Sequence, residues 1–418
     1  MSGQTKGYSG TDKFDGDLAY PVPEDYRTRR PDVRYGEARE VEYDSKTVGK
    51  RRKAIVVLPP EYSEDRKYPV VYLCHGLGQD QTQWLEEGDV PVIAGNMMAD
   101  GWTQEMVLVL PNCRARERDE ADPEDAFSLA NYNAFNKFLE EFVDDLQPFI
   151  EENFAVAAGR ENTAIAGFSM GGRVALYLGM ALQGTFGYIG AFCPAPGIFP
   201  YTQMGVTEEG LFTEESFDLK SEYRDRTFIM IVAGKSDTLV GAYPESYHNA
   251  LQKNGVGHIW YKKTGGHDMN VSGQGLYHFL ESIFWTEILN ITVRIEETHH
   301  IDGSGCSVTM ITFSGFAEGP YFTGNIVPGA VDTQLKRNSM TISARYMLEG
   351  TDKDGQPCSI FIENNAGAGD KYTVPYIITD SRALGFIEHA SLRGKILSQG
   401  DQLNIKIFSD QTDRKEKR

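Results

Sequence analysis

The sequence has few cysteines and no arrangement of them that would hold a metal or a disulfide framework. Its five cysteines are widely spaced, and no two of them form a CxxC pair. The adjacent His299 and His300 would point to opposite faces of a strand, so we expect no metal site there either. No window approaches the roughly eighteen consecutive apolar residues of a membrane span. Because Met1 to Lys6 are followed by polar residues, without the apolar run of a secretory signal, we expect a cytoplasmic protein. We also expect that it needs no cofactor.

Basic residues are also scarce relative to acidic ones. The chain carries 41 Lys and Arg against 60 Asp and Glu, which gives a formal net charge of −19. A nucleic-acid surface needs clustered Lys and Arg that contact phosphates, so this balance argues against a nucleic-acid partner. What is present is the composition of an ordinary soluble globular protein, with 40% hydrophobic and 24% charged residues.

The order of apolar runs predicts an α/β domain. A chain of 418 residues exceeds the size of a single hydrophobic core, so we expect two domains. Residues 1–32 lack periodicity and are expected to form an extended N-terminal arm. Residues 33–291 alternate short apolar runs with amphipathic ones, which is typical of a mostly parallel sheet covered by helices. The expected strands are Ala54–Leu58, Val70–Cys74, Met106–Leu110, Thr163–Ala166, Tyr188–Phe192, Phe228–Val232 and His258–Tyr261, and the expected helices are Ala134–Phe154 (bent at Pro148), Gly172–Leu182 and Leu276–Leu289.

The pattern changes near residue 292. Helical periodicity ends there, and residues 292–410 alternate apolar and polar side chains with period two. The clearest examples are Ser307–Phe313, Met340–Leu348, Ser359–Glu363 and Leu403–Phe408, and Asp352–Gly355 is a hairpin turn signal. We therefore expect a small antiparallel β barrel or sandwich. One hypothesis for its role is a binding or oligomerisation module. A homo-oligomer formed through this domain is one expectation. Residues 411–418 form a charged tail.

A nucleophile motif lies in the first domain. Residues Gly167 to Gly171 read Gly-Phe-Ser-Met-Gly, which matches the G-x-S-x-G pattern of a nucleophile elbow. The expected strand Thr163–Ala166 enters the motif and a helix leaves it at Gly172, which is the setting that the motif requires. The serine sits on a sharp turn, where flanking glycines avoid clashes. We therefore predict that Ser169 is a catalytic nucleophile.

A serine nucleophile needs a histidine base. In folds that carry a nucleophile elbow, this histidine follows the serine in the chain. His248, His258 and His278 fall in expected helices or at a strand start and are interpreted as structural. His267 lies in a Gly-rich loop directly after the last expected strand of the domain. We therefore predict that His267 is the base.

The third member should be an acid that orients the histidine. Asp237 follows the expected strand Phe228–Val232 and so lies at the carboxyl edge of the sheet, where such sites form. Asp225 precedes that strand and would lie at the opposite edge. Asp268 adjoins the base, and neighbouring loop residues seldom point at each other. The prediction is Asp237.

The oxyanion of the reaction needs two N–H donors. One should be the backbone of Met170, directly after the nucleophile, and the other that of Leu77 in the loop after the strand Val70–Cys74. His75 is expected to brace this loop by hydrogen bonding. Trp84, just beyond the loop, is a candidate for contact with an aromatic acyl group.

These motifs together resemble those of carbohydrate esterase family 1. The segments Leu73–Gly78, Gly167–Gly172, Gly234–Asp237 and Gly265–Asp268 carry the resemblance, which is strongest to feruloyl (cinnamoyl) esterase domains attached to bacterial xylanases and runs from about residue 35 to 288. It implies an α/β-hydrolase fold and the same triad of serine, aspartate and histidine. The second domain is more loosely similar to bacterial small barrel domains of uncharacterised function, from which no activity follows.

The resemblance implies a serine esterase that releases ferulate or related hydroxycinnamates from sugar esters of the plant cell wall. The expected partner is a small feruloylated or acylated oligosaccharide. The charged loop Arg114–Ser128 departs from what a phenolic-acid pocket would suggest. Two alternatives therefore stay open: an acetyl-xylan-type or other small acyl esterase, and an acyltransferase that uses the same triad.

Overall fold

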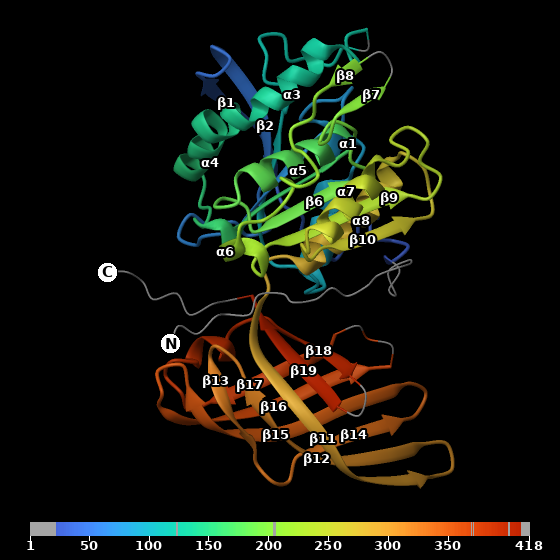
Figure 1. The fold of residues 1–418 in the computed structure, drawn as a ribbon. Coiled ribbons are helices and arrows are strands. Elements are labelled where there is room, and N and C mark those ends of the chain that lie inside the picture. Colours follow the sequence, from blue (N-terminus) through green and yellow to red (C-terminus); the bar gives the residue numbers. More distant parts are fainter. Residues whose placement is uncertain are drawn as a thin grey trace. The chain divides into compact units, whose positions relative to one another are not determined.

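The computed structural model describes residues 22–410 except for 123, 204–205, 369, 371 and 400–401 (Figure 1). The chain divides into two compact units between Phe284 and Trp285. This division precedes the expected boundary near residue 292, because the first strand of the second unit already begins at Thr286. The expected tail, residues 411–418, lies outside the described residues. Among those described, no helix combines the length and apolarity that a membrane crossing requires.

The first unit contains an eight-stranded sheet. Its strands run parallel from β4 through β10 in the spatial order given below. Strands β1 and β2 join it in antiparallel fashion. In spatial order the strands are β1 (Ala38–Ser45), β2 (Lys50–Val57), β4 (Val107–Pro111), β3 (Val70–Cys74), β5 (Thr163–Phe168), β6 (Tyr188–Phe192), β9 (Phe228–Gly234) and β10 (Ile259–Lys263). The predicted α/β-hydrolase architecture is confirmed.

Helices cover both faces of this sheet, and the unit therefore has two cores. In β3, Val70 and Tyr72 face one core, and Val71 and Leu73 face the other. Burial on both faces explains why the strands read as continuous apolar runs. The first core is closed by α3 (Leu129–Glu141), the π-helical turn Phe142–Leu146, α4 (Gln147–Asn153), α5 (Met170–Ala181) and α7 (Tyr243–Lys253), and the second by α2 (Val90–Ala99) and α8 (Met269–Ser282). Shorter elements are α1 (Gln83–Glu86), a 3₁₀ turn at Arg160–Asn162, α6 (Ser221–Arg224) and the hairpin of β7 (Tyr201–Gln203) and β8 (Val206–Glu208).

Two expected helices have different bounds in the structure. The long helix begins at Leu129, capped by Ser128, and contains a π-helical turn just before Pro148, which lacks the N–H that a regular helix needs there. The last helix is α8, which begins after Asp268 and ends at Ser282, so the expected range Leu276–Leu289 was wrong at both ends. Of the apolar residues beyond Ser282, Ile283 and Phe284 pack in the second core of the first unit, and Ile288 and Leu289 belong to the next strand.

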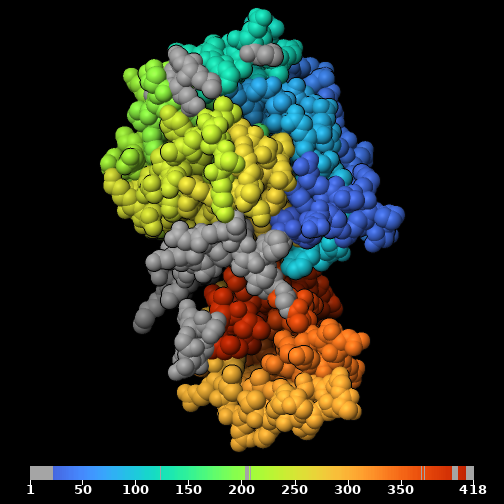
Figure 2. Space-filling model, turned by 90° about the vertical axis from the view of Figure 1, so that its right-hand side faces the viewer, coloured from blue at the N-terminus to red at the C-terminus, as the bar shows by residue number. Residues whose placement is uncertain are grey.

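The N-terminal segment is described only from residue 22, and there it is not an extended arm. It forms turns that lie against α2 and α8. Tyr26 is buried, and its ring lies edge-on to Tyr277 with centroids 6.0 Å apart. Arg27 forms an ion pair with Asp89 just before α2. Figure 2 shows this segment in deep blue beside the gold surface of α8. Buried aromatic side chains, which the sequence pattern did not reveal, attach the segment to the domain.

The second unit is a small antiparallel barrel, as expected. Its path runs β17 (Val374–Thr379), β16 (Pro357–Gly367), β15 (Met340–Asp352), β13 (Phe322–Ile326), β12 (Ser307–Glu318), β11 (Thr286–Asp302), β19 (Gln402–Ser409) and β18 (Leu392–Gln399), with β14 (Val331–Lys336) between β12 and β15 and a 3₁₀ turn at Gly385–Glu388. Thr373 and Gly394 exchange backbone hydrogen bonds, which joins the two ends of the path. The alternating pattern fits one buried core on the inner face.

Candidate active site

Ser169 occupies a strained turn between β5 and α5. Its φ of 56° and ψ of −116° lie outside the regions that non-glycine residues favour. Its backbone N–H donates to the carbonyl of Phe192, and its own carbonyl accepts from the N–H of Ala195, at 2.9 Å each. The glycine of the motif at 171 is required by contact, since a Cβ there would lie 2.2 Å from the Cys74 carbonyl oxygen. The turn is therefore fixed from both sides in a shape that presents the serine hydroxyl.

The three side chains that the sequence predicted as a triad lie in one hydrogen-bonded chain. His267 Nε2 lies 2.8 Å from Ser169 Oγ, and His267 Nδ1 lies 2.8 Å from Asp237 Oδ2. The ring of Phe168 packs beside the imidazole with centroids 4.7 Å apart. These residues follow β5, β9 and β10, parallel strands that end at the same edge of the sheet. That topology is why positions 98 residues apart in the chain meet.

Asp237 is held as a carboxylate. Its side chain is almost fully buried, and burial alone would raise its pKa. The hydrogen bond and charge of His267, together with the backbone N–H groups of Val240 and Leu239, outweigh burial and hold the pKa of Asp237 below its ordinary value. An ionised acid on the Nδ1 side leaves Nε2 free to accept a proton from the serine.

The sequence did not single out Cys193, which also lies beside this chain. Its thiol sulfur, a carboxylate oxygen of Asp237 and a ring nitrogen of His267 all lie within 4.8 Å of one another. Burial, together with the negative charge of Asp237, raises the pKa of the Cys193 thiol. It is therefore a neutral thiol beside the carboxylate. The position follows β6 and carries no motif, so no sequence signal could have found it.

The loop after β3 lies directly beside the start of α5. Strands β3 and β5 are parallel neighbours in which Cys74 aligns with Gly167. The chain after each strand therefore leaves the same edge of the sheet, which brings the predicted oxyanion residues Leu77 and Met170 to the same edge as Ser169. Met170 is the first residue of α5, where backbone N–H groups lack helical partners.

His75 braces this loop, as predicted. It is buried, and burial together with the charge of Arg114 lowers its pKa to about 4. The ring is therefore neutral: Nδ1 donates to the Gly76 carbonyl at 2.7 Å, and Nε2 accepts from the Cys113 N–H at 2.9 Å. The N–H of Gly76 donates to the side-chain oxygen of Gln83 at 2.8 Å. These contacts hold both the N–H and the carbonyl of Gly76 at the start of the loop.

Arg114 holds the same loop at its carbonyl groups. One Nη donates to the carbonyls of Leu77 and Gln79 at 2.8 and 2.9 Å. The other Nη donates to the Asp119 carbonyl, and Nε donates to Asn131 Oδ1. The guanidinium is 1% exposed, so these buried acceptors depend on it. Arginine can make such contacts because its donors form a rigid fork.

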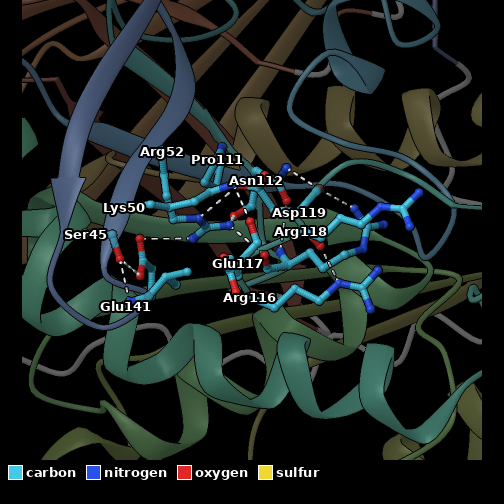
Figure 3. Close-up of polar contacts among 12 residues, drawn as sticks. Ser45, Lys50, Arg52, Pro111, Asn112, Arg116, Glu117, Arg118, Asp119 and Glu141 are labelled. Atoms are coloured by element: carbon cyan, nitrogen blue, oxygen red, sulfur yellow. Dashed lines mark hydrogen bonds and ion pairs between the residues drawn. The ribbon is translucent and has the colours of Figure 1, made fainter.

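Several charges of the loop that begins at Arg114 are paired within the protein. Arg116 forms an ion pair with Asp125, and Asp119 contacts Lys50 and Arg52. Figure 3 shows Arg52 reaching from β2 between Glu141 and the loop. Its Nη2 donates to the carbonyls of Asn112 and Arg114 at 2.9 and 2.7 Å. Part of the charge of this loop therefore serves internal contacts.

The other sequence candidates have structural roles. Trp84 is 1% exposed and donates its indole N–H to the Cys74 carbonyl, so it is a core residue and not a substrate contact. Asp268 caps α8 by accepting from two backbone N–H groups, and it does not contact the imidazole. His248 and His258 contact each other at 2.7 Å, and His278 is buried beside Glu281. None of these five joins the chain that contains Ser169.

Among known proteins of similar sequence and fold are esterases. The model of the Esterase family matches residues 45–282. The chain is 30% identical over 200 residues to the endo-1,4-beta-xylanase/feruloyl esterase of Xylanibacter ruminicola, which covers 44% of this chain and 26% of that protein. It is 37% identical to the CE1 ferulic acid esterase AmCE1/Fae1A of Anaeromyces mucronatus, solved in complex with ferulic acid, with a TM-score of 0.59 and coverage of 63% of this chain and 96% of that one.

A more distant structure shares the fold. The feruloyl esterase module from Clostridium thermocellum, solved with sinapinate, is 16% identical with a TM-score of 0.50, and the match covers 68% of this chain and 96% of that one. The chain spans only 17% to 29% of the length of the curated relatives that it matches. The family model nevertheless covers more than half of the chain. The chain therefore belongs to the Esterase family of α/β-hydrolases, has CE1 ferulic acid esterases among its relatives, and is a carboxylic-ester hydrolase.

Proposed function

We propose that this chain releases ferulate or a related hydroxycinnamate from sugar esters through Ser169, His267 and Asp237. The observation that carries the mechanism is the continuous chain of two 2.8 Å contacts from the serine hydroxyl to the buried carboxylate. A serine hydroxyl becomes a nucleophile when an oriented base takes its proton, and this geometry supplies both base and orienting acid.

In the first half-reaction, His267 Nε2 takes the proton as Ser169 Oγ attacks the ester carbonyl carbon. Asp237 stabilises the imidazolium that forms and fixes the ring orientation. The tetrahedral intermediate collapses when His267 gives the proton to the departing sugar oxygen, which leaves an acyl group on the serine. Water then attacks the acyl carbon with His267 again as base, and the hydroxycinnamate leaves as its acid.

The negative oxygen of the tetrahedral intermediate is stabilised by the backbone N–H groups of Leu77 and Met170. The contacts of His75 and Arg114 support this assignment, because they fix the peptide group that carries the Leu77 N–H and the peptide group that follows it. Donors that are already in place stabilise developing charge without reorganisation, which is why such support matters for rate.

The choice of acyl group is supported by the relative solved with ferulic acid, which is 37% identical and matched over 96% of its length. Part of the charge of the loop that begins at Arg114 is also engaged within the protein, since Arg116, Asp119 and Asp125 form ion pairs there.

The test is hydrolysis of methyl ferulate, 4-nitrophenyl acetate and acetylated xylo-oligosaccharide by wild type, Ser169→Ala and the matched control Ser216→Ala. Ser216 is exposed and distant in sequence from the triad. We expect methyl ferulate to be cleaved well and Ser169→Ala to lose about four to six orders of magnitude in kcat, with Ser216→Ala unaffected. Turnover of the acetyl substrates alone would refute the hydroxycinnamate specificity, and an active Ser169→Ala would refute the triad.

An added acceptor alcohol distinguishes hydrolysis from acyl transfer. The acyl-enzyme of this mechanism can pass its acyl group to water or to an alcohol. We expect free ferulate as the product at moderate acceptor concentration. Preferential formation of the new ester would instead identify a transferase that uses the same three residues.

A further inference from the structure

A cysteine sulfur and a histidine nitrogen lie beside Asp237. Cys193 Sγ, a carboxylate oxygen of Asp237 and a ring nitrogen of His267 lie within 4.8 Å of one another. Within the part of the chain that the structure describes, no other trio of histidine, cysteine and acidic side chains comes this close. The three residues follow β6, β9 and β10, which are neighbours in the sheet.

The Cys193 side chain is held in place by a constrained backbone. Its φ of 47° is unusual for a residue other than glycine. Its N–H donates to the Val232 carbonyl at 2.7 Å, which fixes the segment against β9. The preceding carbonyl, that of Phe192, accepts from Ser169. The thiol therefore belongs to the same rigid frame as the serine and the acid.

These three ligand types are the ones that zinc and cadmium prefer. Thiolate sulfur, imidazole nitrogen and carboxylate oxygen bind zinc at about 2.0–2.3 Å, which places neighbouring ligand atoms about 3.5 Å apart. The widest separation in the trio, at most 4.8 Å, needs to contract by up to about 1.3 Å to reach that spacing. The thiol and carboxylate are buried, and the His267 side chain is 13% exposed, so a cation would enter from the side of the imidazole.

We propose that Cys193, Asp237 and His267 form an inhibitory site for a thiophilic divalent cation such as zinc or cadmium. The inhibition rests on the proposed role of His267 as base, whereas the binding itself does not. The cation takes the place of the proton on Cys193 Sγ, which goes to solvent. It coordinates His267 through Nδ1, and the imidazole then carries its single proton on Nε2. A protonated Nε2 cannot accept the proton of Ser169, so the first step of the reaction stops.

In the cation-free enzyme the same trio does not interfere with the reaction. A neutral thiol leaves the carboxylate of Asp237 paired with His267, as the 2.8 Å contact requires. The site therefore has two states, one with a proton on the sulfur and one with a cation shared among the three residues.

Two measurements test this site, one of activity and one of binding. The first is hydrolysis of 4-nitrophenyl acetate in chelator-free buffer with increasing zinc or cadmium chloride, followed by addition of EDTA. The variants are Cys193→Ala, Cys193→Ser and the control Cys306→Ala, which removes an exposed thiol in the second unit. The second is the ultraviolet charge-transfer absorption of a cadmium thiolate, recorded in variants that also carry Ser169→Ala and Cys306→Ala.

We expect wild type and Cys306→Ala to be inhibited and to recover with EDTA. Loss of a residue that only supports a metal ligand typically lowers metal affinity roughly 10–100-fold. Cys193→Ala and Cys193→Ser remove a direct ligand, so the cation concentration that gives half-inhibition should rise by at least this factor. The absorption should saturate at one cadmium per chain and vanish when Cys193 is replaced. Equal inhibition of Cys193→Ala, or no absorption with Cys193 present, would overturn the proposal. Absorption without inhibition would retain cation binding at Cys193 and overturn its inhibitory role, whereas the proposed function fails separately, if Ser169→Ala remains active.

Discussion

The support that Arg114 gives to the oxyanion loop can be tested by Arg114→Lys. The guanidinium makes four hydrogen bonds, to the carbonyls of Leu77, Gln79 and Asp119 and to the side chain of Asn131. A lysine keeps the charge but has one ammonium with three donors and no fork, so at least one buried acceptor is left unpaired. The expected loss of stability is about 1–3 kcal/mol for each such acceptor.

The effect on catalysis follows from the position of the Leu77 N–H. Complete removal of an oxyanion donor lowers kcat by about 10²–10³-fold, and this is the largest loss that displacement of the Leu77 N–H can cause. A displacement of about 1 Å can already cost about 10²-fold. We therefore expect Arg114→Lys to lower kcat for methyl ferulate by about 10–100-fold. The KM should change little, because the oxyanion forms after the substrate is bound.

Arg160→Lys is the matched control. Arg160 is also buried and also makes four hydrogen bonds, to the carbonyls of Gln183, Phe186 and Arg226 and to Thr227 Oγ1. It precedes β5 and so lies at the opposite edge of the sheet from Ser169. Both variants should lose similar stability in urea unfolding, and only Arg114→Lys should lose kcat. An equal loss of kcat in both, measured where both are folded, would refute the positioning role.

Three further perturbations have definite expected outcomes. Asp237→Asn should lower kcat by about 10⁴, because the imidazole is left in the wrong tautomer, and an unchanged rate would contradict the assignment. The low pKa of His75, about 4 against an ordinary value of about 6.5, means that only the unfolded chain takes up this proton as the pH falls from 6.5 to 4. Stability present above pH 6.5 should therefore decrease by about 3 kcal/mol toward pH 4, and urea unfolding of His75→Gln should lack this component. Gly171→Ala should destabilise strongly, since its Cβ would meet the Cys74 carbonyl at 2.2 Å, whereas Gly78→Ala has no neighbour within 4 Å and should melt like wild type.

Much of the fold could be predicted because local patterns carry it. Strands buried on both faces read as apolar runs, and Val70–Cys74 and Tyr188–Phe192 have the predicted bounds in the structure. Ends set by side-chain capping were less predictable: α8 begins where Asp268 caps it, and the apolar residues of β11 extend the helical pattern past its true end. Packing of Tyr26 against Tyr277 also left no periodic signal in the N-terminal segment.

The triad could be placed from the sequence because each member follows a strand of a parallel sheet. Such strands end at one edge, so Ser169, Asp237 and His267 had to meet there whatever the intervening loops do. Leu77 was placed by the same rule. By this criterion Trp84 was a weaker inference, since it rested on nearness in sequence alone, and the structure buries it.

The sequence by itself determined the succession of strands along the chain, the nucleophile-elbow motif and the choice of Ser169, Asp237 and His267, since chain order and local spacing encode these. Tertiary structure alone decided which side chains support them. Arg114 reaches the oxyanion loop from after β4, and Cys193 reaches Asp237 from after β6. Such contacts depend on rotamers and distances between separate strands, and no spacing in one chain records them.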